Sequence, residues 1–214
     1  MMTKEYLVED LLGQINEDTK LGDLRKIAKE IKQDHALAMK LWASKVYLAR
    51  LLAILIMDKK LLTEEVLEQL DEDMQIHTAS QRNTLMDWLM SNQLTKHKKG
   101  KEMIQSWQHS QSALQRRAFW YYQGRLRWTG KTPPNNTAEL LSYIEDNIMA
   151  EEPEVQWAMN FVAGWIGVYD TSYRERCIQL GERTGLYRGD HVSKGCTPNY
   201  LPEFIEIEAS KRNI

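Results

Sequence analysis

The feature that most constrains this chain is an apolar periodicity of three to four residues, which continues along almost its whole length. Residues that break helices are scarce, with 11 glycines and 5 prolines among 214 residues, and this scarcity favours long helices over many tight turns. No stretch shows the two-residue alternation of a β-strand. The pattern therefore predicts an all-α protein whose consecutive amphipathic helices pack as antiparallel pairs, in the manner of an α-solenoid or bundle.

Several expected helices carry recognisable end signals. Thr3 and Thr63 are expected N-caps, and two glutamates favourably follow Thr63 in the first turn. Asn136, with Glu139 three residues later, has the spacing of a capping box. Pro153 suits the first turn of another helix, because a proline there lacks only an N–H that the helix leaves unpaired.

The clearest interruption is the segment TGKTPPNN, residues 129–136, in which two prolines exclude helix. Further along, Asp170 is an expected N-cap and Gly185 an expected helix end. From about residue 186 the chain reads as an irregular tail that wraps over the last helices. We expect a single domain over residues 1–214, ending in that tail.

The net charge of −2 hides one concentrated basic segment. Residues 95–131 hold nine basic residues and one acidic residue, whereas the flanking parts of the chain are both acidic. A weakly acidic protein with one such segment is typical of a local anion site rather than of a generally basic surface.

Signatures of common enzyme chemistry are missing from the sequence. It contains no dinucleotide-binding or phosphate-loop glycine pattern, no GxSxG and no HExxH. The five histidines show no metal spacing, and Cys177 and Cys196 form no CxxC pair, so we expect no metal, no nucleotide or other cofactor, and two structural thiols. The longest apolar run, Leu51–Met57, is too short for a membrane span. We expect a monomeric, soluble, cytoplasmic protein.

The basic segment KHKKGKEMIQSWQHSQSALQRRAFWYYQGRLRW, residues 96–128, interleaves cations with aromatic residues over two expected helices, near 100–107 and 111–128. Such interleaving is typical of nucleic-acid binding, because cations neutralise phosphates and aromatic faces stack on bases. The alternative is a solvated basic face on helices whose aromatic residues belong to the core. The candidate DNA-binding residues are Lys96, Lys98, Lys99, Lys101, Arg116 and Arg125.

Several segments together resemble the AlkD-type DNA alkylation repair family. They are LRKIAKEI, then ALAMKLWASKVYLARLLAILIMDKK at residues 36–60, then SWQHSQSALQRRAFWYY, and then WAMNFVAGWIGVYDTSYRERCIQLGERTG. Trp42 and Arg50 occupy characteristic places in the second of them, although Leu48 stands where a glutamate is common. The resemblance spans about residues 20–185 and rests on the order and spacing of several segments. The tail GCTPNYLPEFI is similar to a sub-branch of the family.

This resemblance implies HEAT-like repeats that form a concave basic surface for double-stranded DNA. Glycosylase members of the family excise N3- or N7-alkylated purines, using two tryptophans, an aspartate and a supporting arginine. The corresponding positions in this chain, which are our candidate catalytic residues, are Trp88, Phe161, Asn92 and Arg117.

The match departs from the family at two of these positions. Phe161 is aromatic but smaller than tryptophan, and Asn92 has no charge. A carboxylate about 4 Å from a unit positive charge contributes roughly 4 kcal/mol at an effective dielectric constant near 20, which is about a thousandfold in rate. Asp87 does not replace it, because on a helix it points about 100° away from Trp88.

Three functions follow as hypotheses. The first is a DNA repair protein that excises alkylated bases, and the second is a non-catalytic protein that binds DNA by shape and charge. The third is a protein-binding helical scaffold, a role to which such repeats commonly turn. A steep loss of DNA affinity with added salt separates the first two from the third.

Overall fold

A computed structural model describes residues 7–129 and 133–214, and every regular element in these ranges is a helix. The predicted all-α class is therefore confirmed. The expected cap at Thr3 lies outside the described residues. Contacts divide the chain into two compact units, Met1–Ser106 and Trp107–Ile214, where we expect one domain. We call them unit 1 and unit 2 and describe each by itself.

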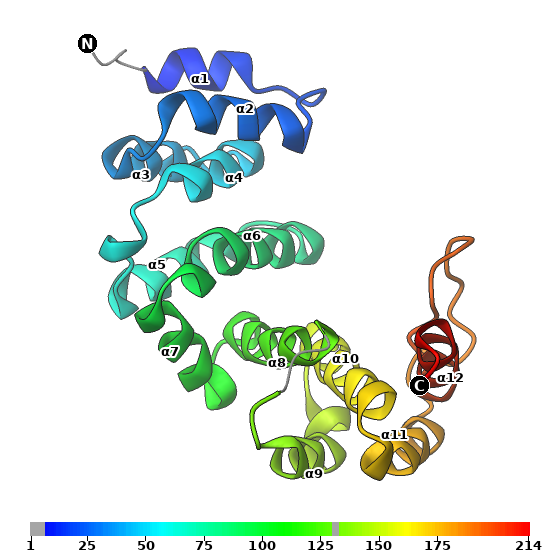
Figure 1. Cartoon of the computed structure of the whole chain (residues 1–214). Helices are drawn as coiled ribbons and strands as arrows, with labels where there is room; N and C mark the ends of the chain where they lie inside the picture. The colour runs from blue at the N-terminus through cyan, green and yellow to red at the C-terminus, as the bar shows by residue number, and fades with distance from the viewer. Residues whose placement is uncertain (1–6, 130–132) are drawn as a thin grey trace. The chain divides into compact units, whose positions relative to one another are not determined.

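Unit 1 is built from helices in two layers (Figure 1). Helices α2 and α6 both pack against α4, which also packs against α3; α1 contacts α3, and α5 contacts α6. Antiparallel pairing of this kind is what the periodicity predicts. The elements are α1 (Val8–Gln14), α2 (Leu21–Ile31), α3 (His35–Ala43), α4 (Tyr47–Ile56), η1 (Lys59–Leu61), α5 (Glu64–Met74), α6 (Ala79–Asn92), η2 (Leu94–Lys96) and α7 (Lys98–Ser106).

A buried arginine joins three helices of unit 1. Arg50 on α4 is 1% exposed; its Nε donates to the carbonyl of Trp42 at 3.1 Å, and its Nη1 donates to the carbonyl of Asp73. The Trp42 indole N–H donates to the Asp73 carboxylate at 2.8 Å. Trp42 and Arg50, two residues on which the family resemblance depends, therefore fix α3, α4 and α5 together and act in the core.

Unit 2 is organised around α10, which packs against α8, α9, α11 and α12 (Figure 1). Helix α10 is buried on most sides and approaches α12 through small residues. A Cβ added at Gly164 would lie 2.8 Å from the Phe204 ring, and one at Gly167 would lie 2.5 Å from Ile205. The elements are η3 (Trp107–His109), α8 (Ala113–Trp128), α9 (Thr137–Asn147), η4 (Ile148–Ala150), α10 (Pro153–Tyr169), α11 (Thr171–Thr184) and α12 (Leu201–Arg212).

The tail differs from our expectation of an irregular segment from about residue 186. The irregular part ends at Tyr200, and α12 follows with Pro202 in its first turn. Helix α12 buries Leu201 and Ile205 against α10 and α11. The Glu208 carboxylate on α12 accepts hydrogen bonds from Lys211 at 2.8 Å and from Thr197 in the irregular segment, so the tail is tied into unit 2.

The helix-end predictions have mixed outcomes. The Thr63 hydroxyl accepts from the N–H of Val66, Pro153 begins α10, and Gly185 ends α11 with φ = 64°, so these three are confirmed. The capping box at Asn136 is wrong, because the Asn136 side chain makes no cap hydrogen bond. Its amide oxygen instead accepts from Arg127 Nη2 at 2.8 Å.

Candidate nucleic-acid interface

Ser112 is the N-cap of helix α8, and its hydroxyl accepts from the N–H of Gln115 at 3.3 Å. One helical turn beyond its middle, Gly124 allows α10 to come close. A Cβ at Gly124 would lie 2.3 Å from Cδ1 of Phe161, so the Phe161 ring rests directly on the α8 backbone. This packing fixes the position of one of our four candidate catalytic residues.

Aromatic residues recur every four residues along α10, which places them on one face of the helix. The Trp157 and Phe161 rings are stacked with centroids 5.5 Å apart, and Phe161 and Trp165 meet edge to face at 6.1 Å. Trp165 and Tyr169 are stacked at 5.9 Å. Trp157 and Phe161 are half-buried and Tyr169 is exposed, so this face reaches the surface of unit 2.

Arginine side chains lie over the rings of this face and of α8. The guanidinium of Arg117 is 5.4 Å from the Tyr121 ring and 5.5 Å from the Trp157 ring. The guanidinium of Arg125 is 5.8 Å from Tyr121 and 5.4 Å from Trp128. Each such contact stabilises the cation without removing its positive charge. The aromatic–arginine row consists of Arg117, Tyr121, Arg125, Trp128, Trp157, Phe161, Trp165, Tyr169 and Arg212.

Arg117 and Phe161, which the family resemblance pairs in one site, are brought together in unit 2. Both contact the rings of Tyr121 and Trp157. Arg117 is only 5% exposed, so it packs against these two rings and is itself buried.

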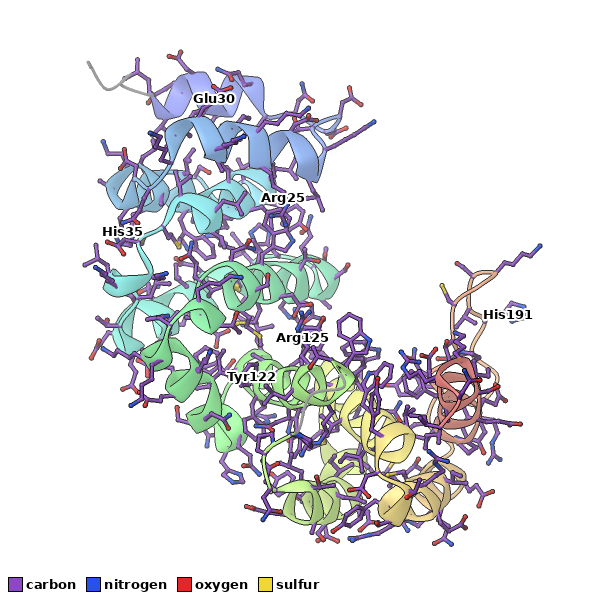
Figure 2. All side chains as sticks on the ribbon, in the orientation of Figure 1. Arg25, Glu30, His35, Tyr122, Arg125 and His191 are labelled. Carbon is purple, nitrogen blue, oxygen red and sulfur yellow. The ribbon has the colours of Figure 1, made fainter. Side chains whose placement is uncertain are left out.

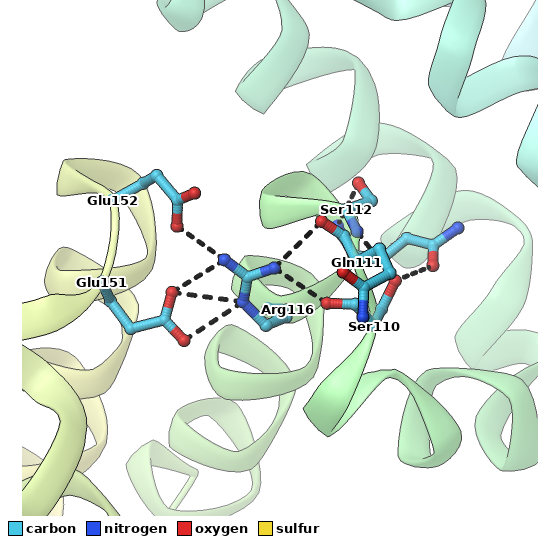
Figure 3. A network of polar contacts seen from close by, with 7 residues as sticks. Ser110, Gln111, Ser112, Arg116, Glu151 and Glu152 are labelled. Atoms are coloured by element: carbon cyan, nitrogen blue, oxygen red, sulfur yellow. Dashed lines mark hydrogen bonds and ion pairs between the residues drawn. The ribbon is translucent and has the colours of Figure 1, made fainter.

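Arg116, the neighbour of Arg117, has a different setting (Figure 3). Its Nε and Nη2 donate to the Glu151 carboxylate at 2.9–3.1 Å, and Nη2 also donates to Glu152 at 2.6 Å. Its Nη1 donates to the carbonyls of Ser110 at 2.8 Å and Gln111 at 3.1 Å. The hydrogen bond to Glu151 first, and then the charges of Glu151 and Glu152, raise the pKa of Arg116. Because all three guanidinium nitrogens of Arg116 donate to these partners, we leave Arg116 out of the proposed DNA-contact surface.

Arg127, another cation of the basic segment, is also internal. It is 3% exposed and donates to the carbonyl of Gln123 at 3.1 Å as well as to Asn136. Burial lowers its pKa to about 10. Part of the basic segment thus stabilises the fold, and part remains available at the surface.

The lysines of the basic segment belong to unit 1. Lys96 in η2 and Lys98, Lys99 and Lys101 in α7 are exposed. Lys98 lies 3.6 Å from Glu102, but both side chains are largely exposed, so this pair contributes little and does not withhold Lys98 from a phosphate. These four cations remain candidates for phosphate contact.

Trp88 and Asn92 also belong to unit 1, one turn apart on α6. Trp88 is half-buried, and the Arg25 guanidinium of α2 lies 4.6 Å from its ring centroid. The Asn92 amide donates to the carbonyl of Trp88 at 2.9 Å. Asn92 is thus a neutral side chain that is hydrogen-bonded to its own helix.

Beside Asn92 lies an open pocket of about 420 Å³ whose lining includes four cations, Arg25, Lys29, Lys32 and Lys59. Sequence reasoning missed it. The signal was the helical spacing of Arg25 and Lys29, which places two cations on one face of α2, with Lys32 directly after the helix. Lys59 joins them only through the fold.

Residues 7–129 and 133–214 contain no group of three or more histidine, cysteine or acidic side chains that could hold a metal ion. Nor do they contain a helix long and apolar enough to cross a membrane.

Comparisons with known proteins bear on the family and the fold. A family model described as DNA alkylation repair enzyme matches residues 19–171. A solved structure described as "a new family of proteins related to the HEAT-like repeat DNA glycosylases with affinity for branched DNA structures" superposes with a TM-score of 0.64 at 18% identity, covering 96% of this chain and 87% of that chain. At this identity the likeness establishes the fold, which is the predicted HEAT-like one. A comparison with curated proteins gave no match.

Proposed function

The chain belongs to the DNA alkylation repair enzyme family, and from that premise we propose that it binds DNA through the aromatic–arginine row of unit 2 and the exposed lysines of α7. The row is the observation that carries the proposal. Half-buried rings with cations over them offer both elements that nucleic acid needs, a face for a base or sugar and a charge for a phosphate.

The row suits DNA better than a purely structural role does. A buried pair such as Trp42 and Arg50 is closed to DNA, whereas the half-buried Arg125 lies over the Tyr121 and Trp128 rings, which reach the surface. Lys99 and Lys101 add exposed positive charge in unit 1. Each phosphate neutralised by such a side chain releases counterions, so binding should weaken steeply as salt is added.

Excision of N3- or N7-alkylated purines is the second candidate, favoured by the aromatic residues Trp88 and Phe161 at the family positions. The surroundings of Asn92 argue against the family's usual route. Asn92 carries no charge and donates to the Trp88 carbonyl, and the adjoining pocket is lined by cations. Positive charge there opposes both a cationic base and the cationic sugar of the transition state.

Binding is tested by titrating labelled DNA at several salt concentrations, with linear duplex, single strands and a four-way junction as ligands. The junction is included because the solved relative is described as having affinity for branched DNA. The variant is Arg125→Ala, and the matched control is Arg183→Ala, an exposed arginine on α11 of the same unit.

We expect Arg125→Ala to weaken binding about tenfold to every form of DNA it binds, as loss of a charged contact does, while Arg183→Ala binds like the wild type. No binding to any of the three ligands at low salt, with the protein folded, would refute the proposal and favour a protein partner.

Excision is tested separately by release of free base from methylated duplex DNA. We expect no release above the uncatalysed background. Release that disappears in Trp88→Ala but persists in Arg183→Ala would show that the protein is a glycosylase working without the family's aspartate.

A further inference from the structure

The pocket beside Asn92 is lined by cations that are not part of the aromatic–arginine row of unit 2. It lies wholly within unit 1, among α2, α4, η1 and α6. Its charged lining residues are Arg25, Lys29, Lys32 and Lys59, and no carboxylate is among the described residues that line it. From this lining we infer that the pocket is a binding site for a phosphate-bearing group of nucleotide size.

The four cations are free to meet an anion. Within residues 7–129 and 133–214, none of them forms an ion pair with a carboxylate. Bringing like charges to one pocket is unfavourable unless an anion neutralises them. A phosphate matches this set best, because the planar guanidinium can bind two of its oxygens while each lysine supplies a point charge.

The nearest acidic residues in sequence are held elsewhere. The Asp34 carboxylate accepts from the N–H of Leu37 at 2.9 Å as the cap of α3, and the Asp58 carboxylate accepts from the N–H of Lys60 at 2.9 Å. Glu30 is on α2 but on the side nearer α1, whereas Arg25 extends toward α6 (Figure 2). Within the described residues, none of these acids forms an ion pair with any of the four cations.

Arg25 is pre-positioned within the lining. Its guanidinium lies 4.6 Å from the Trp88 ring centroid, and a cation over a tryptophan face is held without using its N–H donors. A phosphate bound there would thus meet an arginine that needs little reordering, which reduces the entropic cost of binding.

The remaining lining fits the rest of a nucleotide. Ala28, Leu55 and Met57 give the pocket an apolar wall, and Gln33, Asn92 and Gln93 give it amides. A volume of about 420 Å³ lies within the range of small-molecule sites and exceeds what a bare phosphate needs. An apolar wall suits a sugar or base. The exposed Gln33 amide can bind its polar edge, whereas the amide N–H groups of Asn92 and Gln93 already donate to the carbonyls of Trp88 and Ile54.

The phosphate could come from a DNA strand end or from a free nucleotide, and the experiment separates these sources. Binding is measured by calorimetry at low salt with deoxyadenosine 5′-monophosphate, with deoxyadenosine, and with an oligonucleotide carrying either a 5′-phosphate or a 5′-hydroxyl. The variants are Lys29→Glu and Lys59→Glu. Lys60→Glu is the matched control, because it neighbours Lys59 in η1 but does not line the pocket.

We expect the monophosphate to bind and the nucleoside not to bind. Lys59→Glu should weaken phosphate binding about tenfold at low salt, whereas Lys60→Glu should change it less than twofold. A preference for the 5′-phosphorylated strand that Lys59→Glu abolishes would assign the pocket to strand ends. Monophosphate binding without that preference would assign it to free nucleotide.

The inference is overturned if neither phosphate probe binds, or if Lys60→Glu is as damaging as Lys59→Glu. If circular dichroism shows that Lys29→Glu or Lys59→Glu does not fold, Lys29→Gln and Lys59→Gln are used instead, because they change the charge less. Because the inference does not rest on unit 2, Arg125→Ala should leave monophosphate binding intact even though it weakens duplex binding.

Discussion

Arg116 offers a sharp test of how this chain uses its basic segment. The sequence places it beside Arg117 as a phosphate ligand, but the structure surrounds it with Glu151, Glu152 and two carbonyls (Figure 3). The side chains of Arg116 and Glu151 are only 13% and 11% exposed. Arg116→Ala should therefore destabilise unit 2 while leaving DNA affinity within about twofold of the wild type.

The magnitude follows from what the substitution leaves behind. Removing one member of a buried ion pair costs about 3–5 kcal/mol, because the partner stays buried without compensation. We expect Arg116→Ala to cost about 3 kcal/mol, the lower end of this range, because the pair is slightly exposed and Glu152 is partly exposed. With typical urea m-values this lowers the unfolding midpoint by roughly 1–3 M.

The assay is urea unfolding followed by circular dichroism, beside a DNA titration of the same proteins. Glu152→Gln is the control, because the Glu152 side chain is 52% exposed and an exposed pair contributes at most about 1 kcal/mol. Arg116→Ala/Glu151→Ala should be less destabilised than the sum of the single changes, since it leaves no unpaired charge. A destabilisation below 1 kcal/mol, together with a large loss of DNA affinity, would refute the reasoning.

Three further predictions concern other contacts. Gly124→Ala should displace Phe161, because the added Cβ would lie 2.3 Å from the ring. We expect the free energy of unfolding, measured by thermal unfolding, to fall by about 1–3 kcal/mol. Gly22→Ala is the control, because a Cβ added at Gly22 meets open space. Burial raises the pKa of Glu208, but hydrogen bonds from Lys211, Thr197 and Arg212 outweigh it and lower the pKa to about 2. Its contribution, about 3 kcal/mol, should be present above pH 4.5 and lost toward pH 2, so the stability difference between wild type and Glu208→Gln should shrink over that window; a constant difference would contradict this. Replacing Lys98 and Lys99 by Gln should lower the salt slope of DNA binding by about two, whereas replacing Lys40 and Lys45 should not change it; equal slopes for both pairs would exclude the α7 lysines.

Local signals were sufficient for much of the fold. Apolar periodicity predicted an all-helical chain, and Thr63, Pro153 and Gly185 mark helix ends because each satisfies a backbone requirement within its own turn. Asn136 has the same kind of local signal, but its side chain accepts a hydrogen bond from Arg127 and does not cap α9. Helix α12 was missed because its burial depends on glycines of α10 and α11 far away in sequence.

In the candidate site, too, some features follow from the sequence and others only from the tertiary structure. The sequence by itself determined that cations and aromatic residues are concentrated in residues 96–128, and that the family position for an aspartate holds Asn92. Only the tertiary structure decided that Arg116 meets Glu151 and Glu152 while the adjacent Arg117 lies against the Tyr121 and Trp157 rings, since the two side chains leave the helix about 100° apart. Lys59 likewise reaches the cations of α2 only through packing, because side-chain partners depend on which helices meet and not on the order of residues along the chain.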